Sequence, residues 1–145
     1  MAAAIYLDTS ALAKWYLNEA GSEEVEVFLL EEAPVAISTF SVVEMRCLLA
    51  RRRRAGEIDP MLEMRIFATL EEDMRSGHLV RHPVEDAMVV AAPGWIASLP
   101  DHPLRALDAL HLAIAMDLGV STVATADPVM AGAAEALDLQ VKRFG

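Results

Sequence analysis

The chain has 145 residues, of which 54% are hydrophobic and 23% charged; this composition is typical of a globular protein and excludes a disordered one. The length fits a single domain over residues 1–145. The 22 acidic residues outnumber the 12 basic ones and give a net charge of −10, which argues against nonspecific binding to nucleic acid.

Three further absences restrict the class of protein to which the chain can belong. The longest uncharged run, residues 87–100, is only 14 residues long and contains Pro93 and Gly94, so we expect no membrane span. The N-terminus lacks the basic first region of a secretory signal, and the single cysteine, Cys47, has no partner for an internal disulfide or a zinc site. We therefore expect a cytoplasmic protein.

Short aliphatic runs alternate with segments of helical periodicity along the whole chain. In chain order we expect strand 2–8, helix 10–20, helix 22–32, strand 35–38, helix 40–54, helix 60–76, strand 78–84, a helix after residue 84 that breaks at Pro93 and Gly94 and resumes over 95–99, helix 104–118, strand 120–125, helix 128–138 and strand 139–144.

This alternation predicts an α/β fold, namely a three-layer sandwich with a short-stranded, mainly parallel central sheet flanked by helices. Ligands of such sheets bind outside the carboxyl ends of the strands. Three acids lie there: Asp8 ends the first strand, Asp127 follows the fourth, and Glu44 lies in the first turns of the helix after the second. A fourth acid, Asp108, differs because it lies inside a predicted helix.

Helix capping is the simpler interpretation for each of the first three acids. Asp8 can cap the helix that follows it, Asp127 precedes a proline as N-caps often do, and Ser41 with Glu44 matches a capping box. Asp59 has the same cap pattern after a loop instead of a strand. A cap pattern alone therefore does not identify a functional site.

Capping does not account for Asp108 in the predicted helix, because its side chain shares an apolar face with Leu104 and Leu112. Glu44 lies one turn from Phe40, so its side chain should also point toward covered surface. Burying an ionised carboxylate costs several kcal/mol unless a cation or strong hydrogen bonds compensate its charge. We therefore expect both acids to have such partners.

Two kinds of partner can compensate these charges. Arg105 lies three residues before Asp108 and can form a structural ion pair, with His111 bridging the acid or filling the core. Alternatively, the four acids converge on a divalent metal ion. Oxygen ligands without thiolates select Mg²⁺ or Mn²⁺ over zinc, and such an ion can activate water for phosphodiester hydrolysis.

Four segments, in their order and spacing, resemble a PIN domain, in particular the VapC-type toxins of prokaryotic toxin–antitoxin pairs. They are YLDTSAL at residues 6–12, Glu44 in the helix after the second strand, RALDALHLA at 105–113 and TVATAD at 122–127. The resemblance covers essentially the whole chain. It implies that Asp8, Glu44, Asp108 and Asp127 bind Mg²⁺, or Mn²⁺ in its place, with Ser10 and Thr125 as supporting hydroxyls.

The resemblance also implies a function. The chain would be a Mg²⁺-dependent endoribonuclease, the toxin component of a type II toxin–antitoxin pair, acting on transfer or ribosomal RNA. It would form a homodimer and bind a small cognate antitoxin. The alternative is a catalytically inactive PIN-like module that binds RNA or a peptide. A phosphate-accepting receiver domain is less favoured, because it would need an acidic pair after the first strand and a phosphorylatable aspartate after a central strand, and only half of this is present. Asp8 also does not match the nucleophile of DxD-type phosphoaspartyl transferases, because Ser10 occupies the place of their second aspartate.

A run of four arginines, Arg51, Arg52, Arg53 and Arg54, stands out in an otherwise acidic chain. A solvated helix end is the simpler interpretation, since cations there complement the helix dipole. The alternative is a contact with the RNA backbone or with a second copy of the chain.

Overall fold

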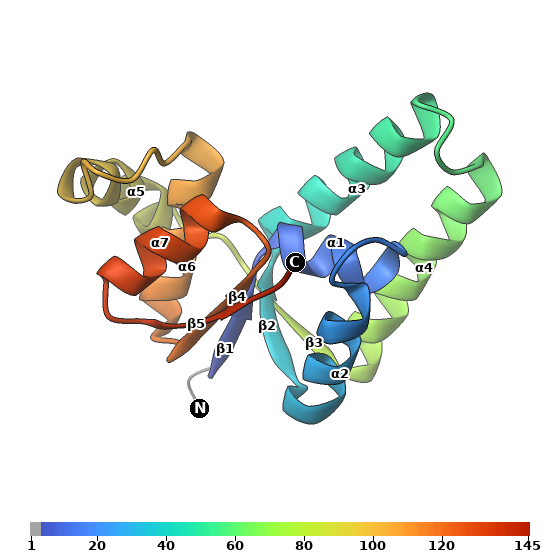
Figure 1. The fold of residues 1–145 in the computed structure, drawn as a ribbon, viewed down its shortest axis with the longest axis horizontal. Helices are drawn as coiled ribbons and strands as arrows, with labels where there is room; N and C mark the ends of the chain where they lie inside the picture. The colour runs from blue at the N-terminus through green and yellow to red at the C-terminus, as the bar shows by residue number, and fades with distance from the viewer. Residues whose placement is uncertain (1–3) are drawn as a thin grey trace.

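The computed structural model describes residues 4–145. Within that range the chain forms five strands and seven helices in the predicted order (Figure 1). The strands are β1 (Ile5–Leu7), β2 (Val35–Ser38), β3 (Leu79–His82), β4 (Thr122–Thr125) and β5 (Gln140–Arg143). The helices are α1 (Thr9–Tyr16), α2 (Ser22–Glu32), α3 (Thr39–Arg54), α4 (Pro60–Ser76), α5 (Asp86–Ser98), α6 (Ala106–Leu118) and α7 (Pro128–Ala136). Residues 2 and 3, which the sequence assigns to the first strand, lie outside the described residues.

All the strand pairings are parallel, in the order β3-β2-β1-β4-β5. In the central strand, Tyr6 pairs with Ala36 of β2 on one side and with Val123 of β4 on the other. The chain builds outward from β1 to β3 and then crosses to β4 and β5, so the strand order reverses between β1 and β4. Ligand sites of open parallel sheets lie outside the carboxyl ends of the strands at such a reversal.

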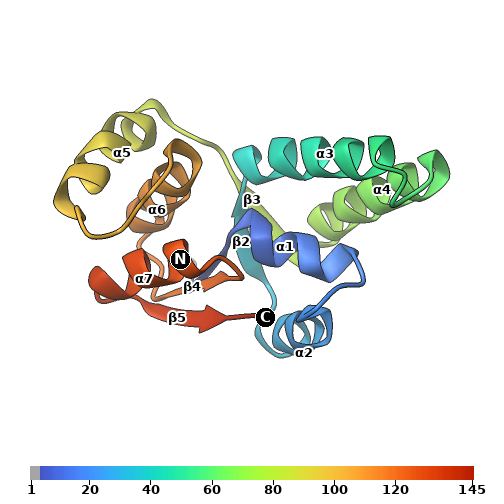
Figure 2. The same cartoon turned by 45° about the horizontal axis from the view of Figure 1, so that its top comes forward.

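Helices cover both faces of the sheet, which confirms the predicted three-layer sandwich (Figures 1 and 2). Alternate residues of the strands separate two hydrophobic cores, because successive side chains of a strand point to opposite faces. Ile5 and Leu7 join the core under α1–α4, whereas Tyr6 and Val123 join the core under α5–α7.

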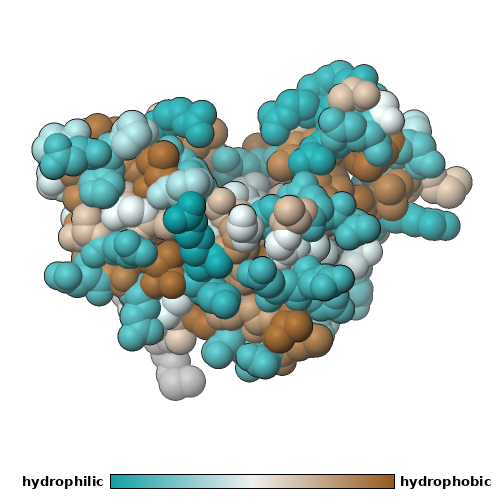
Figure 3. All heavy atoms as spheres, viewed as in Figure 1, coloured by the Kyte–Doolittle hydropathy of each residue, from teal (hydrophilic) through white to brown (hydrophobic). Residues whose placement is uncertain are grey.

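Helices α3 and α4 form a hairpin that extends beyond the sheet (Figure 1). Its two helices are joined by Glu63 of α4, which lies 3.1 Å from Arg46 and 2.7 Å from Arg53 of α3. Figure 3 shows a hollow between this hairpin and the half of the molecule formed by α5–α7. The carboxyl ends of the central strands point toward this hollow.

The predicted break at Pro93 and Gly94 is wrong, because α5 runs without interruption from Asp86 to Ser98. A proline inside a helix removes one backbone hydrogen bond, to the carbonyl four residues earlier. Both Pro93 and Val89 are exposed, so water can satisfy that carbonyl and the helix continues. No helix within residues 4–145 has both the length and the apolar character needed to cross a membrane.

The capping box predicted for Ser41 and Glu44 is also different. Ser38, the last residue of β2, caps α3 by accepting the backbone N–H of Ser41, whose hydroxyl accepts the N–H of Ser38 in return. The helix thus begins at Thr39, directly after the strand. As a result Glu44 lies in the second turn, where its carboxylate is not needed for capping.

Candidate functional site

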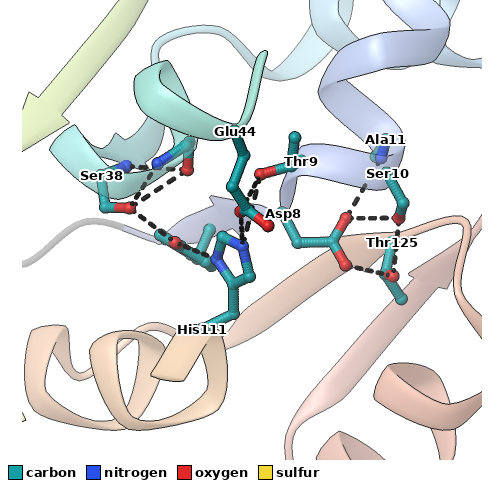
Figure 4. A network of polar contacts seen from close by, with 10 residues as sticks. Asp8, Thr9, Ser10, Ala11, Ser38, Glu44, His111 and Thr125 are labelled. Carbon is teal, nitrogen blue, oxygen red and sulfur yellow. Dashed lines mark hydrogen bonds and ion pairs between the residues drawn. The ribbon is translucent and has the colours of Figure 1, made fainter. Parts of the chain in front are cut away.

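Asp8 lies at the carboxyl end of β1, at the reversal of strand order, and only 4% of its surface is exposed. Its carboxylate receives hydrogen bonds from the Ser10 hydroxyl (2.6 Å), the backbone N–H of Ala11 (3.1 Å) and the Thr125 hydroxyl (2.6 Å). The bond from Ala11 is the helix cap that the sequence predicts. Of the two hydroxyl groups, that of Ser10 bonds Oδ1 and that of Thr125 bonds Oδ2 (Figure 4).

Burial raises the pKa of Asp8 above its ordinary value, although the charge of His111 and the bonds from Ser10, Thr125 and Ala11 oppose the shift. Burial dominates because a carboxylate that leaves water loses more solvation than neutral hydrogen bonds return. Within residues 4–145, no lysine or arginine forms an ion pair with Asp8. Asp8 is therefore a buried carboxylate without a basic partner, an arrangement that favours the binding of a cation.

Ser10 and Thr125 join the start of α1 to the end of β4 around Asp8. Their hydroxyl groups lie 3.2 Å apart, and each also accepts a backbone N–H from the turn after β4, from Ala126 to Ser10 (2.9 Å) and from Asp127 to Thr125 (3.0 Å). The start of α1 and the end of β4 are thus held together around one carboxylate. Both residues named in the sequence as supporting hydroxyls contact Asp8 directly.

Glu44 reaches the site from α3, with 21% of its side chain exposed. Its Oε1 atom lies 2.5 Å from His111 Nε2 and accepts a hydrogen bond of 2.5 Å from the Thr9 hydroxyl. Burial raises the pKa of Glu44, but the bond and the charge of His111, together with Thr9, outweigh burial and hold that pKa below its ordinary value. Glu44 is therefore ionised at neutral pH.

His111 is buried, as expected for a core histidine, but both of its ring nitrogens have polar partners. Nε2 faces Glu44, and Nδ1 lies 2.7 Å from the hydroxyl of Tyr6 in β1. The Tyr6 hydroxyl in turn donates to Ser38 at 3.2 Å. Figure 4 shows this chain of contacts beside the contacts of Asp8. The histidine connects α6, on one face of the sheet, with α3, on the other.

The structure corrects the interpretation of Asp108. Helix α6 begins at Ala106, so Asp108 lies in its first turn and accepts the backbone N–H of Arg105 at 3.0 Å. Asp108 therefore does have a capping role, and the expectation that capping cannot account for it is wrong, because the helix begins later than predicted. The acid is nonetheless covered, with 13% of its side chain exposed.

Arg105 does not neutralise Asp108 effectively. Its Nε atom lies 3.7 Å from the acid, and its own side chain is 84% exposed. Exposed ion pairs of this kind contribute about 0–1 kcal/mol. Arg105 is therefore a weak counter-ion for Asp108.

We predict that Arg105→Ala lowers the free energy of unfolding by less than about 1 kcal/mol, because the backbone N–H that Asp108 accepts is retained. Urea denaturation measures this change. Arg75→Ala is a matched control, since it removes another exposed pair at the same spacing, with Glu72. A loss clearly larger than that of the control would show that Arg105 is the structural counter-ion of Asp108.

Asp127 caps α7, as its sequence pattern predicts. Its Oδ1 atom accepts the backbone N–H of Val129 at 2.9 Å, and the residue is half-buried. It follows β4 in the chain, next to Thr125, which is bound to Asp8. The second oxygen of Asp127 makes no hydrogen bond with the described residues.

The four acids lie around one end of the sheet, but they do not form a preassembled metal cage. Over residues 4–145, no three histidine, cysteine or acidic side chains are close enough together to hold a metal ion. The chemistry of the side chains nevertheless fits a hard divalent cation, because carboxylate and hydroxyl oxygens predominate and thiolates are absent. The buried charge of Asp8 fits such an ion as well.

The arginine run lies at the far end of α3, and its members differ. Arg53 binds Glu63, and Arg52 lies 3.1 Å from both Glu19 and Glu57. Arg51 and Arg54 are exposed and form no ion pair with the described residues. Arg53 therefore holds the hairpin together, Arg52 ties it to the segment before α2, and Arg51 and Arg54 are available to a partner.

Thr9 and Tyr6 also belong to the polar network of Glu44 and His111, although their sequence positions did not predict it. Thr9 stands beside Asp8 in the DTS segment, and its hydroxyl bonds Glu44. Tyr6 lies between two residues that face the other core, so strand alternation could have assigned it to the same side as α6. A tyrosine that is fully buried in this way needs a hydrogen-bond partner, which here includes His111.

Solved structures with a similar fold include three with at most 21% sequence identity. VapC20 of Mycobacterium tuberculosis, a sarcin–ricin loop cleaving toxin, is 20% identical with a TM-score of 0.71, and the match covers 90% of this chain and 95% of VapC20. FitAcB from Neisseria gonorrhoeae is 21% identical (TM-score 0.65, coverage 95% and 96%). VapBC2 from Rickettsia felis, bound to a DNA fragment from their promoter, is 13% identical (TM-score 0.66, coverage 97% and 99%).

No curated protein matches the sequence significantly. The sequence does match the PIN domain family over residues 5–136, which is nearly the whole chain. The all-parallel sheet and the acids at the carboxyl ends of its strands agree with this match. The chain belongs to the PIN domain family.

Proposed function

We propose that this protein is a Mg²⁺-dependent endoribonuclease and the toxin of a type II toxin–antitoxin pair. The observation that carries the proposal is the buried Asp8 carboxylate, which has no lysine or arginine counter-ion within residues 4–145 and lies where the strand order reverses. The burial of such an anion destabilises the folded protein unless a cation binds to it. Membership of the PIN domain family supports nuclease activity as the use of that cation.

Asp8, Glu44, Asp108 and Asp127 would hold the ion. The last three each keep one carboxylate oxygen, Oε2 or an Oδ, without a hydrogen bond to the described residues. When bound, Mg²⁺ or Mn²⁺ would polarise a phosphodiester and lower the pKa of a water molecule. Ser10 and Thr125 would hold Asp8 in place while it binds the ion.

The similar structures suggest the substrate class and the partner. One is a toxin that cleaves the sarcin–ricin loop, and another is VapBC2 bound to DNA of its promoter. We propose that this chain cleaves transfer or ribosomal RNA in the cytoplasm, as a homodimer, and that a small cognate antitoxin inhibits it. Such a substrate or peptide would enter the hollow that Figure 3 shows between the α3–α4 hairpin and the half of the molecule formed by α5–α7.

Purified protein incubated with RNA and Mg²⁺ tests the proposal. We expect internal cleavage that EDTA abolishes and that Mg²⁺ or Mn²⁺ restores. Mapping the fragment ends would then identify the site of cleavage. RNA that stays intact in the presence of either metal would overturn the enzymatic proposal.

A second candidate is a catalytically inactive PIN-like module that binds RNA or a basic peptide. It is favoured by the hydrogen bonds that each acid already makes within the chain and by the absence of a three-residue metal group over residues 4–145. RNA or peptide binding without metal binding or cleavage would support this candidate. The binding of metal to the folded chain would count against it.

For the arginine run, we predict that the double variant Arg51→Glu, Arg54→Glu weakens RNA binding. Two lost contacts with single-stranded phosphates should make the plot of log affinity against log salt about 1.4 less steep. Binding is measured in EDTA to prevent cleavage. Arg75→Glu, at the opposite end of the hairpin, is the control and should leave the slope unchanged. If the double variant changes only the oligomeric state in sedimentation, the run is a dimer contact instead.

A further inference from the structure

The side chain of His111 is held from both sides. Its Nδ1 atom lies 2.7 Å from the Tyr6 hydroxyl, and its Nε2 atom lies 2.5 Å from Glu44 Oε1. Behind Tyr6, Ser38 accepts from the tyrosine and lies 3.1 Å from the Ser41 hydroxyl. Tyr6, Ser38 and Ser41 are completely buried, and His111 is 5% exposed.

This arrangement holds the imidazole ring in either protonation state of Nδ1. The single proton of the Tyr6 hydroxyl goes to Nδ1 when that nitrogen is bare, and to Ser38 when Nδ1 itself donates to Tyr6. A carboxylate only accepts, so the ring nitrogen facing the ionised Glu44 carries a proton. The ring also lies against Phe40, with 5.2 Å between the ring centroids. The imidazole therefore has little freedom to move.

The fixed imidazole in turn limits the movement of the Glu44 side chain. Its side chain has three rotatable bonds and is 21% exposed, so without partners it would sample several rotamers. Both of its hydrogen bonds within the described residues, from His111 and from Thr9, go to Oε1. One oxygen is thus held from the protein side, and Oε2 is left for a ligand.

We propose that His111 is a positioning residue, which orients Glu44 so that its Oε2 atom faces a divalent ion at the proposed site. The inference rests on the proposed function, because it gives that site a residue that contacts neither substrate nor metal. His111 lies on α6 and Glu44 lies on α3, so the contact between them holds Glu44 from the opposite face of the sheet. Groups that support metal ligands in this way typically change metal affinity or activity about 10- to 100-fold when they are removed.

If His111 merely fills the core, its substitutions should have different effects. In that case, an apolar residue of similar size would serve equally well, and an amide that keeps a donor would have no advantage. His111→Leu and His111→Gln separate the two roles, because only glutamine retains an N–H that can reach Glu44. His78→Leu, an exposed residue at the amino end of β3, is the control for the histidine-to-leucine change.

The experiment measures Mn²⁺ affinity by electron paramagnetic resonance on full-length protein. We expect His111→Leu to bind Mn²⁺ about 10- to 100-fold more weakly, His111→Gln to recover most of that loss, and His78→Leu to match the wild type. In the metal-free protein, NMR contacts between the Glu44 methylene protons and the Thr9 methyl group should be present in the wild type and in His111→Gln. They should be lost in His111→Leu.

Wild-type Mn²⁺ affinity in folded His111→Leu would overturn the proposal, and so would unchanged Glu44–Thr9 contacts in that variant. If His111→Leu does not fold, Tyr6→Phe takes its place, because it leaves Nδ1 without its partner. We then expect a smaller loss of affinity, and wild-type affinity in Tyr6→Phe would overturn the proposal. If the wild type itself binds no Mn²⁺, the proposed function fails, whereas the NMR comparison still decides whether His111 positions Glu44.

Discussion

Asp8→Asn should abolish Mg²⁺-dependent RNA cleavage while the protein stays folded. The substitution removes the buried negative charge and keeps the shape of the side chain. Changes to groups that only support a metal ligand cost about 10- to 100-fold, so the loss of a direct ligand should exceed about 100-fold. Cleavage rates at saturating Mg²⁺, with circular dichroism of the same samples, measure both properties.

The fold should tolerate this variant, because asparagine is also a favourable N-cap residue. Its carbonyl oxygen can accept the N–H of Ala11, and its amide can donate to Thr125. Asp59→Asn is the matched control: Asp59 caps α4 through the N–H of Leu62 at 2.7 Å, away from the site. Cleavage by Asp8→Asn at the rate of the control would contradict the proposed role of the buried carboxylate.

Mn²⁺ should stabilise the wild-type protein against heat, and Asp8→Asn should remove this effect. At a metal concentration of 100 times Kd, binding adds about 2.7 kcal/mol to the free energy of unfolding, which corresponds to a rise in Tm of roughly 5–10 °C. A bound metal ion would relieve the cost of burying the Asp8 charge. Thermal melts with and without Mn²⁺ measure the shift, with Asp59→Asn again as the control.

The stability of the metal-free protein and its stabilisation by Mn²⁺ should change with pH in opposite directions. Because the folded-state pKa of Asp8 is raised, Asp8 contributes to the stability of the metal-free protein at low pH. This contribution is lost as the pH rises through that pKa. The stability of the wild type relative to Asp8→Asn should therefore fall as pH rises above about 4, the ordinary value. Mn²⁺ needs the ionised acid, so its stabilisation should grow over the same range. Metal stabilisation that is independent of pH would argue against binding at Asp8.

The local signals in the sequence predicted most of the fold. Aliphatic runs identified all five strands, and Asp-Pro pairs placed the starts of α4 and α7, because an N-cap carboxylate and a proline at the first position act within one turn. The prediction failed at Arg105, which is a poor N-cap by type. The start of α6 was consequently placed too early, and Asp108 was assigned to the helix interior instead of its first turn.

The sequence by itself determined the order of the elements, the acids at the strand ends and the family resemblance, since these depend on residue type and on short spacings. Only the tertiary structure decided which groups meet. Glu44 and His111 are 67 residues apart, and Thr125 is 117 residues from the Asp8 carboxylate to which it donates. Such contacts depend on strand order and on the packing of helices on opposite faces, which no local pattern encodes. The same packing removes Asp8 from water without giving it a lysine or arginine partner among the described residues, and this is why it is the centre of the proposed site.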